Sequence, residues 1–344
     1  MQDKSISFKT VSLQKDESVL NAIKHLLALV DLSLDNHVND FVVGYVEQQI
    51  VACAGLDHNI IKCVAVHPDY QGSQLTLKLI NTVIDLADEK NQHHLFLYTK
   101  PDNVPFFKSC GFYPLVKIDE TVTLMENTPV GINHYCQKLA QHKKVGTCGA
   151  IVMNANPFTR GHLYLVELAA KTVDWLYIFV VEEDASLFPT AIRHQLVKQG
   201  VSHLGNVSVF LGSEYMVSKA TFPSYFLKDQ TLIEQTYMAI DLLLFREYIA
   251  PALTISVRFV GTEPRSELTN AYNQAMPYWL EQKALSTAPI IKVIEIPRVT
   301  ASNDVISASR VRALLAQKRY QEVYDLVPKS TWSYLQQHYV IEDK

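Results

Sequence analysis

The chain has no surplus of charge of either sign. Its 344 residues include 31 Lys and Arg and 35 Asp and Glu, which leave a formal net charge of −4. A protein that coats nucleic acid needs a basic face to displace the counterions of the phosphate backbone. This balance argues against a nucleic-acid partner, so any phosphate site must be local.

Cysteine is scarce, and long apolar runs are missing. The five cysteines show no C-x-x-C spacing and are odd in number, which argues against a disulfide framework or structural zinc and favours a reducing compartment. Residues 1–10 are polar, unlike a signal peptide, and no uncharged stretch approaches the roughly 20 residues that span a bilayer. We therefore expect a soluble, cytoplasmic protein with no membrane partner.

The composition that is present is globular, with 48% hydrophobic and 19% charged residues, in a chain long enough for two cores. Short strands around a helix in the first half are typical of an α+β domain. We place this domain at residues 1–125 and a linker, with a short helix inside it, at residues 126–146. The expected elements of the first domain are strands at 41–46, 50–55, 60–66 and 95–98 and a helix at 75–86.

From Cys148 onward strands and helices alternate, which predicts parallel strands with helical crossovers, a Rossmann-like α/β domain over residues 147–344. In such sheets ligands bind outside the carboxyl ends of the strands. Asn154, Gly261 and Ser307 follow such ends. The expected strands are 149–153, 175–181, 207–211, 254–260 and 290–296, and the expected helices are 162–172, 191–203, 232–248, 267–284 and one from about 307.

The segment NPFTRGH, residues 156–162, joins the first of these strands to its helix. Backbone amides and the positive dipole end at a helix start favour an anion. Gly161 lets that anion approach the backbone, and His162 opens the helix with a ring nitrogen aimed the same way. The pattern predicts that this loop holds the phosphates of a nucleotide.

A second segment, ISASRVR at residues 306–312, precedes a later helix. NPFTRGH resembles the (H/T)xGH signature of the nucleotidylyltransferases, and ISASRVR resembles their second signature, ISxTxxR. The pair implies a cytidylyltransferase-like domain that holds a nucleoside triphosphate while its α-phosphorus is attacked in line. The catalytic residues would be His162 at the α-phosphate and Arg312 at the β and γ phosphates, and Thr159 would offer a hydroxyl. The expected nucleotide-binding set is Asn154, Asn156, Thr159, Gly161, His162, Gly261, Ser307, Ser309, Arg310 and Arg312.

Three further features leave alternatives open. The acidic run 182–184 is a magnesium or substrate site or, as we favour, a solvated loop. Loop 261–265 contacts the ligand or only turns the chain, and Arg193 caps or pairs on its own helix. Mg²⁺ is expected with ATP as the substrate, but its ligands are not assigned.

Other segments extend the resemblance over nearly the whole chain. They are MNANPFTRGH, GSEY at 212–215, ATFP at 220–223, VGTEP at 260–264, AYNQ at 271–274 and ISASRVR. Together they resemble the citrate (pro-3S)-lyase ligase family, also called acetate:citrate lyase ligases. The resemblance implies an acid–thiol ligase that adenylates acetate with ATP and releases pyrophosphate. It then passes the acetyl group to the thiol of a CoA-like prosthetic group on the acyl carrier subunit of citrate lyase, which activates the lyase.

A carboxylate acceptor suits this reaction because it is ionised at neutral pH and needs no general base. Two other interpretations stay open. One is an adenylyltransferase that acts on a phosphate monoester, and the other is a non-catalytic GNAT-like module that only binds nucleotide.

The first domain resembles the GNAT acetyltransferases. VAVHPDYQG at residues 64–72 is similar to their acyl-CoA-binding motif, and residues 103–112 are similar to their last motif. Gln74 and Thr76 replace small residues of the pyrophosphate loop, and Phe107 stands where many members have a tyrosine acid. These departures argue against independent acetyl-CoA chemistry. Docking of the carrier's prosthetic group and a purely structural role both remain open.

Overall fold

The described part of the protein forms two compact units. Unit 1 contains the described residues up to Ile132 together with residues 230–240, and unit 2 contains residues 133–216 and those from Asp241 onward. None of the described helices is long and apolar enough to cross a membrane. The computed structural model describes residues 6–13, 16–71, 74–182, 186–216, 230–264, 266–301 and 304–339.

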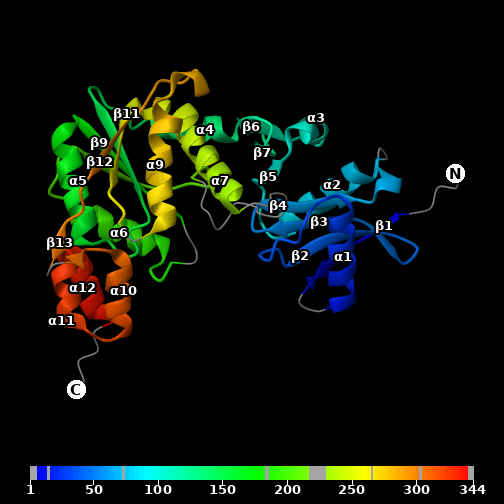
Figure 1. The fold of residues 1–344 in the computed structure, drawn as a ribbon, viewed down its shortest axis with the longest axis horizontal. Helices are drawn as coiled ribbons and strands as arrows, with labels where there is room; N and C mark the ends of the chain where they lie inside the picture. Colours follow the sequence, from blue (N-terminus) through cyan, green and yellow to red (C-terminus); the bar gives the residue numbers. More distant parts are fainter. Residues whose placement is uncertain are drawn as a thin grey trace. The chain divides into compact units, whose positions relative to one another are not determined.

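Unit 1 is built on a seven-stranded sheet with the strand order β1-β2-β3-β4-β5-β7-β6 (Figure 1). All neighbouring strands are antiparallel except β4 and β5, which are parallel. The strands are β1 (Ile6–Ser12), β2 (Asp40–Val46), β3 (Gln49–Asp57), β4 (Ile60–Val66), β5 (Phe96–Thr99), β6 (Tyr113–Ile118) and β7 (Val122–Glu126). The helices are α1 (Glu17–Leu29), η2 (Pro68–Tyr70), α2 (Leu75–Glu89), η3 (Pro101–Asn103) and α3 (Val104–Ser109).

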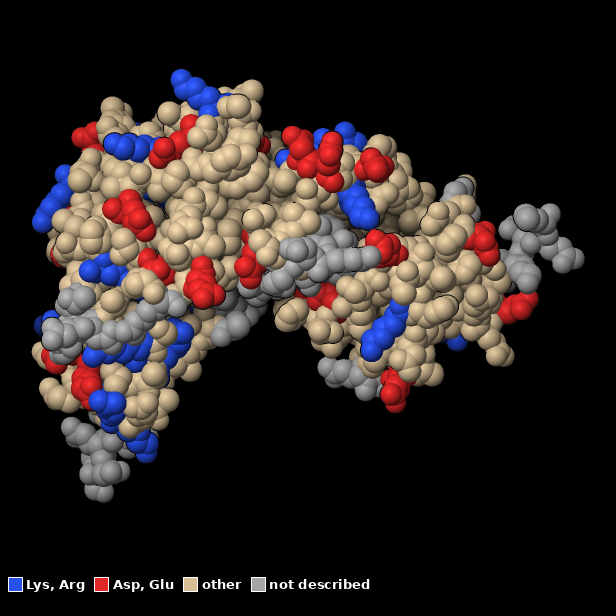
Figure 2. All heavy atoms as spheres, viewed as in Figure 1, with Lys and Arg blue, Asp and Glu red and all other residues tan. Residues whose placement is uncertain are grey.

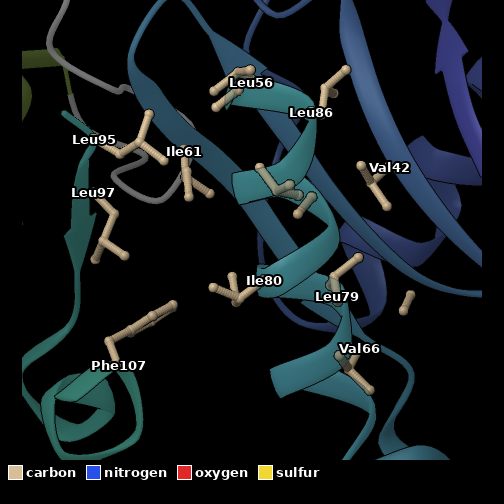
Figure 3. Close-up of a cluster of buried hydrophobic side chains, with 14 of the residues drawn as sticks. Val42, Leu56, Ile61, Val66, Leu79, Ile80, Leu86, Leu95, Leu97 and Phe107 are labelled. Atoms are coloured by element: carbon tan, nitrogen blue, oxygen red, sulfur yellow. The ribbon is translucent and has the colours of Figure 1, made fainter. Parts of the chain in front are cut away.

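Helix α2 packs an apolar face onto this sheet. Leu79, Ile80 and Val83 recur at helical spacing and are fully buried, which is the pattern that predicted the helix. Figure 3 shows Leu79 and Ile80 among side chains from the strands, such as Val42 and Leu56. Each fully buried side chain of this size contributes roughly 1.5–3 kcal/mol, so this face fixes α2 in place.

Unit 2 contains a five-stranded sheet with the order β10-β9-β8-β11-β12, in which every neighbouring pair is parallel. The predicted parallel sheet is confirmed. Strand order reverses between β8 and β11, the position where open α/β sheets bind ligands. The strands are β8 (Cys148–Met153), β9 (Trp175–Val180), β10 (Val207–Leu211), β11 (Ile255–Gly261) and β12 (Lys292–Ile296).

Helices cover both faces of the sheet of unit 2. Alternate strand residues point to opposite faces, so Ile151 and Ile178 join one core cluster while Ala150 and Tyr177 join another. The first cluster includes residues of α5 and α6, and the second includes residues of α7 and α9. The helices are α4 (Gly131–Ala140), α5 (Arg160–Thr172), α6 (Thr190–Gly200), α7 (Gln230–Leu244), the π-helical η4 (Phe245–Ile249), α8 (Ala250–Leu253), α9 (Glu267–Glu281) and η5 (Lys283–Leu285).

The chain then forms a short hairpin and three helices with a core of their own. The elements are β13 (Thr300–Ala301), β14 (Asp304–Val305), α10 (Ala308–Ala316), α11 (Tyr320–Leu326) and α12 (Lys329–His338). This part holds the loop before α5, because Thr331 Oγ1 donates to the Phe158 carbonyl at 2.8 Å and Arg160 Nε donates to the Val327 carbonyl at 3.1 Å. Figure 2 shows Lys and Arg gathered over α10–α12 on the drawn face.

Candidate active site

A cavity of about 540 Å³ opens at the carboxyl ends of β8, β11 and β12 in unit 2. It lies at the reversal of strand order, and both sequence signatures reach it. Most of the residues expected to bind nucleotide line this cavity: Asn154, Thr159, Gly161, His162, Gly261, Ser307, Ser309 and Arg312. Asn156 and Arg310 are not among its lining residues.

Thr159 is the N-cap of α5, and its side chain is engaged in that cap. Its hydroxyl accepts the His162 backbone N–H at 3.3 Å and lies 3.0 Å from His162 Nδ1. Thr159 is only 1% exposed. The geometry therefore favours a positioning role for this hydroxyl over the direct phosphate contact expected from the sequence.

The imidazole of His162 is held in one orientation. The Thr159 backbone N–H donates to Nδ1 at 3.1 Å, so the neutral ring carries its proton on Nε2. The ring also stacks on Phe158, with 5.8 Å between centroids and 12° between planes. Burial, and secondly the charge of Arg298, lower the pKa of His162 from 6.5 to about 4. At neutral pH the ring is therefore an uncharged hydrogen-bond donor.

The second signature begins α10 in the same manner. The Ser307 hydroxyl accepts the Arg310 backbone N–H at 3.2 Å and lies 3.1 Å from the Ser309 hydroxyl. The two signatures also meet directly. A Cβ at Gly161 would lie 3.1 Å from the Ile306 carbonyl oxygen, tighter than nearly all such contacts. Gly161 therefore lets the two helix starts approach each other, a requirement in addition to the phosphate approach expected from the sequence.

Asn156 supports the cavity from outside its lining. Its carbonyl accepts from Arg312 Nη1 at 2.6 Å, and its side-chain Oδ1 accepts the Phe188 backbone N–H at 3.1 Å. The sequence placed Asn156 and Arg310 with the nucleotide-binding residues because they stand inside the signatures. In the structure the Asn156 carbonyl holds the guanidinium of Arg312, which lines the cavity.

Arg298 and Glu263 also line the cavity. The sequence did not indicate Arg298, and it left the role of Glu263, in loop 261–265, open. Glu263 accepts from Arg298 Nη2 and from the Ser266 backbone N–H, and the Arg298 backbone N–H donates to Thr262 Oγ1 at 3.1 Å. These contacts tie together the loops after β11 and β12. Arg298 comes two residues after the end of β12, so the strand-end rule that selected Gly261 would have found it.

Arg193 has a larger structural role than capping its own helix. It is fully buried, and its Nη1 donates to Asn154 O, Asn154 Oδ1 and Val181 O at 2.7–2.8 Å. The Asn154 side chain therefore has a fixed orientation at the end of β8. Arg193 acts on the cavity through Asn154, since Arg193 is not a lining residue.

In the described part of the chain, no group of three or more His, Cys, Asp or Glu side chains is arranged to hold a metal ion. Glu182 of the acidic run is described, but residues 183 and 184 lie outside the described residues. The five cysteines are all free thiols in this structure.

The chain is similar to curated ligases over nearly its whole length. Citrate (pro-3S)-lyase ligase of Haemophilus influenzae is 46% identical over 334 residues, which are 96% of this chain and 98% of that relative. The chain belongs to the citrate (pro-3S)-lyase ligase family. The Klebsiella pneumoniae member is 44% identical to this ligase over 97% of each chain.

Family models agree with the two halves of the ligase. The citrate lyase ligase C-terminal domain matches residues 148–335, and the GNAT acetyltransferase family matches residues 8–112. Among solved structures, Thermotoga maritima TmcAL bound with alpha-thio ATP covers 56% of the ligase and 55% of that chain, with 16% identity and a TM-score of 0.36. The expected fold class, a GNAT-like α+β part followed by a Rossmann-like part with a parallel sheet, is confirmed.

Proposed function

We propose that this ligase adenylates acetate with ATP and then transfers the acetyl group to the thiol of the prosthetic group on the acyl carrier subunit of citrate lyase. Membership of the family supports a ligase that activates citrate lyase. One observation carries the nucleotide step. The starts of α5 and α10 converge on a single cavity that also holds a neutral imidazole and two guanidinium groups.

The cavity suits a triphosphate because positive charge lines it and because hydrogen-bond donors point into it. The amides at the starts of α5 and α10 face it with the positive ends of their helix dipoles. His162 would donate Nε2–H to a non-bridging oxygen of the α-phosphate. Ser307, Ser309 and Arg312 would contact the β and γ phosphates, where charge develops as pyrophosphate departs.

In the first step an acetate oxygen attacks the α-phosphorus in line. The new P–O bond forms as the bond to the pyrophosphate oxygen breaks, and acetyl adenylate and pyrophosphate result. The attacking oxygen is already anionic, so no side chain has to remove a proton. The protein's contribution is to hold the two anions together and to neutralise the charge on the departing group.

In the second step the carrier's thiolate attacks the acetyl carbonyl carbon. The C–S bond forms, the C–O bond to AMP breaks, and the thiol proton passes to solvent. The nucleophilic sulfur belongs to the carrier. Cys148 of the ligase is fully buried in the sheet and takes no part.

Mg²⁺ would accompany ATP, and it would depend mainly on phosphate oxygens and water. The carboxylate that lines the described cavity is Glu263, and it is already bonded to Arg298. Magnesium is commonly held by one or two carboxylates together with substrate phosphates. The cavity is compatible with such binding, but it does not form a protein cage for the ion.

The charges favour acetate over a phosphate monoester as the acceptor. A phosphate monoester would bring a second multiply charged group next to the triphosphate. The guanidinium groups in the described lining are Arg298 and Arg312, and Arg298 is paired with Glu263. This limited positive charge suits a monoanion.

Exchange of labelled pyrophosphate into ATP tests the first step. We expect exchange that depends on acetate, followed by AMP formation and restored lyase activity when deacetylated citrate lyase is added. Reactions without acetate, and with phosphopantetheine in its place, are the controls. An absence of exchange with acetate, or exchange with phosphopantetheine instead, would refute the proposal.

A further inference from the structure

Three arginine side chains are buried in the described part of unit 2: Arg193, Arg246 and Arg258. The first two are surrounded by oxygen acceptors. Arg193 bonds to the carbonyls of Asn154, Val181 and Phe188, and Arg246 bonds to those of Trp279, Gln282, Ala288 and Pro289. Arg258 is different, because its Nε and Nη1 atoms are buried and have no hydrogen-bond partner among the described residues. A buried charged donor without an acceptor is unfavourable, so an acceptor from outside the protein would stabilise this guanidinium.

Arg258 lies at the inner end of the cavity of unit 2. The pairing of β8 with β11 ends at Ala150 and Arg258, and the residues that follow on both strands line the cavity. Alternate residues share one face of a sheet, so Val260 is the next residue on the Arg258 face, roughly 7 Å farther along the strand. Arg258 is not a lining residue, but an arginine side chain is long enough to cover this distance.

The residues packed against Arg258 keep its guanidinium charged and fix its plane. Its Cζ atom lies 4.3 Å from the centre of the Phe245 ring. Burial lowers the pKa of Arg258, and the nearby Tyr272 and Asp241 counter part of that shift. The Tyr272 hydroxyl donates to the Asp241 carboxylate. Tyr272 belongs to the segment AYNQ, to which the proposed function gives no role, and it lies one turn along α9 from Thr269, which lines the cavity.

The side chains between Arg258 and the cavity are apolar. Val152 and Val260 line the cavity and pack in the same cluster as Phe245 and Tyr272. A cation next to apolar walls suits a small ion that combines a carboxylate with an alkyl group. A triphosphate suits this position less, because its charges would have to leave water among these side chains.

We propose that Arg258 binds the carboxylate of acetate and that Val152 and Val260 contact its methyl group, so that the inner end of the cavity is the acetate site. This inference rests on the proposed function, because acetate is the acceptor only in that reaction. One carboxylate oxygen accepts from the guanidinium. The other oxygen faces the cavity, where His162 would hold the α-phosphate that it attacks.

Arg258→Met tests the site, because it removes the charge and keeps much of the volume. Replacement of a buried charge by an apolar side chain is often neutral or stabilising, and Asp241 keeps its bond to Tyr272, so this variant should fold. In acetate-dependent pyrophosphate exchange the KM for acetate should rise at least about tenfold, and the KM for ATP should stay within about twofold. An unchanged KM for acetate would overturn the proposal.

Ser256→Ala is the matched control. Ser256 lies two residues before Arg258 on β11, on the side away from the cavity, and its hydroxyl donates to the Cys148 carbonyl at 3.5 Å. Both KM values should stay within about twofold in this variant. Thermal unfolding adds a measurement without turnover, since a ligand raises the Tm of the protein that binds it. Acetate should raise the Tm of the unmodified ligase and of Ser256→Ala but not that of Arg258→Met, and an equal rise in all three would contradict the site.

Val260→Ala tests the contact with the methyl group and leaves Arg258 in place. Val260 is half-buried, and its truncation makes room for one more carbon atom next to the bound carboxylate. The ratio of kcat/KM for propionate to kcat/KM for acetate should rise about tenfold, the typical effect of one methylene group in an apolar pocket. An unchanged ratio would overturn the proposal.

Failure of this site and failure of the proposed function give different results. If acetate were not the acceptor, the unmodified ligase would show no acetate-dependent exchange. If acetate were the acceptor but bound elsewhere, the unmodified ligase would catalyse exchange and Arg258→Met would have the same KM for acetate.

Discussion

Units 1 and 2 of this ligase each contain a cavity, and the two cavities differ in the side chains that line them. In unit 2 the pairing of β8 with β11 ends at Ala150 and Arg258, and His162, Arg298 and Arg312 line the cavity that opens beyond this point. In unit 1 the parallel pair of β4 and β5 separates after Ile61 and Leu97, and the cavity there is lined by apolar side chains, neutral polar side chains and Lys100. A reacting phosphate needs donors fixed at defined points. The difference supports the proposal that the nucleotide chemistry takes place in unit 2.

The largest expected effect comes from His162→Ala. Loss of the Nε2–H donor should reduce the rate of acetate-dependent exchange about 100- to 1000-fold, as loss of one preorganised donor does elsewhere. His203→Ala is the control, since that imidazole is exposed and paired with Glu167. Exchange by His162→Ala within about twofold of the unmodified rate would contradict the role of this imidazole as a donor.

Arg298→Ala should have the next largest effect. Removal of a charge-assisted donor from the cavity should lower kcat/KM for exchange about tenfold to a hundredfold. It should also raise the pKa of His162, because Arg298 is one of the two causes that lower it. Arg319→Ala, which breaks the exposed pair with Glu322, is the control. An NMR titration of His162 that is unmoved by Arg298→Ala would place this cation away from the imidazole.

A change of pH should affect the rate of exchange less than these substitutions do, and it should change the free energy of unfolding in one predictable direction. Because the pKa of His162 is lowered from 6.5 to about 4, the imidazole stays neutral through weakly acidic pH and no inflection should occur near 6.5. Between these two values the unfolded chain binds a proton that the folded ligase does not, so the free energy of unfolding falls as pH falls across that window. An activity limb near 6.5 that disappears in His162→Ala would contradict this ionisation.

The smallest effect is expected from Phe107→Tyr in unit 1. It restores a hydroxyl at the position of the GNAT acid, but the described cavity still has no general base. Exchange should remain within about twofold of the unmodified rate, and chromatography should detect no release of CoA from acetyl-CoA. Release of CoA from acetyl-CoA by this variant would show that the missing hydroxyl at residue 107 is all that prevents acetyl transfer in unit 1.

Much of the fold follows from periodicity, and the misses have physical causes. The strands of the parallel sheet and the helices between them were predicted to within a few residues because buried parallel strands read as apolar runs. Strand β1 was not predicted, because its burial alternates weakly and its neighbour β2 determines the pairing. Helices α11 and α12 are short, and their core includes residues distant in sequence, such as Phe188.

The site residues that lie in the two signatures could be predicted from the sequence. The residues that reach the site through contacts between distant parts of the chain could not. Gly161, His162 and Ser307 stand beside helix starts, so their positions could be read from local sequence. The contact of the Thr159 hydroxyl with His162 is local, three residues apart, whereas the bond from Arg193 to Asn154 spans 39 residues and cannot be read from spacing. Arg298 was within reach of the strand-end rule, but no signature marked it.

The attachment of the His162 loop to the C-terminal helices bears on how the ligase is synthesised. Thr331 follows Phe158 by 173 residues, and its hydroxyl bond to the Phe158 carbonyl cannot form earlier. At translation rates of about 5–20 residues per second, the nascent loop waits on the order of ten to thirty seconds for this partner. The ability to bind nucleotide should therefore be among the last properties the emerging chain acquires, after unit 1 has had time to fold on the ribosome.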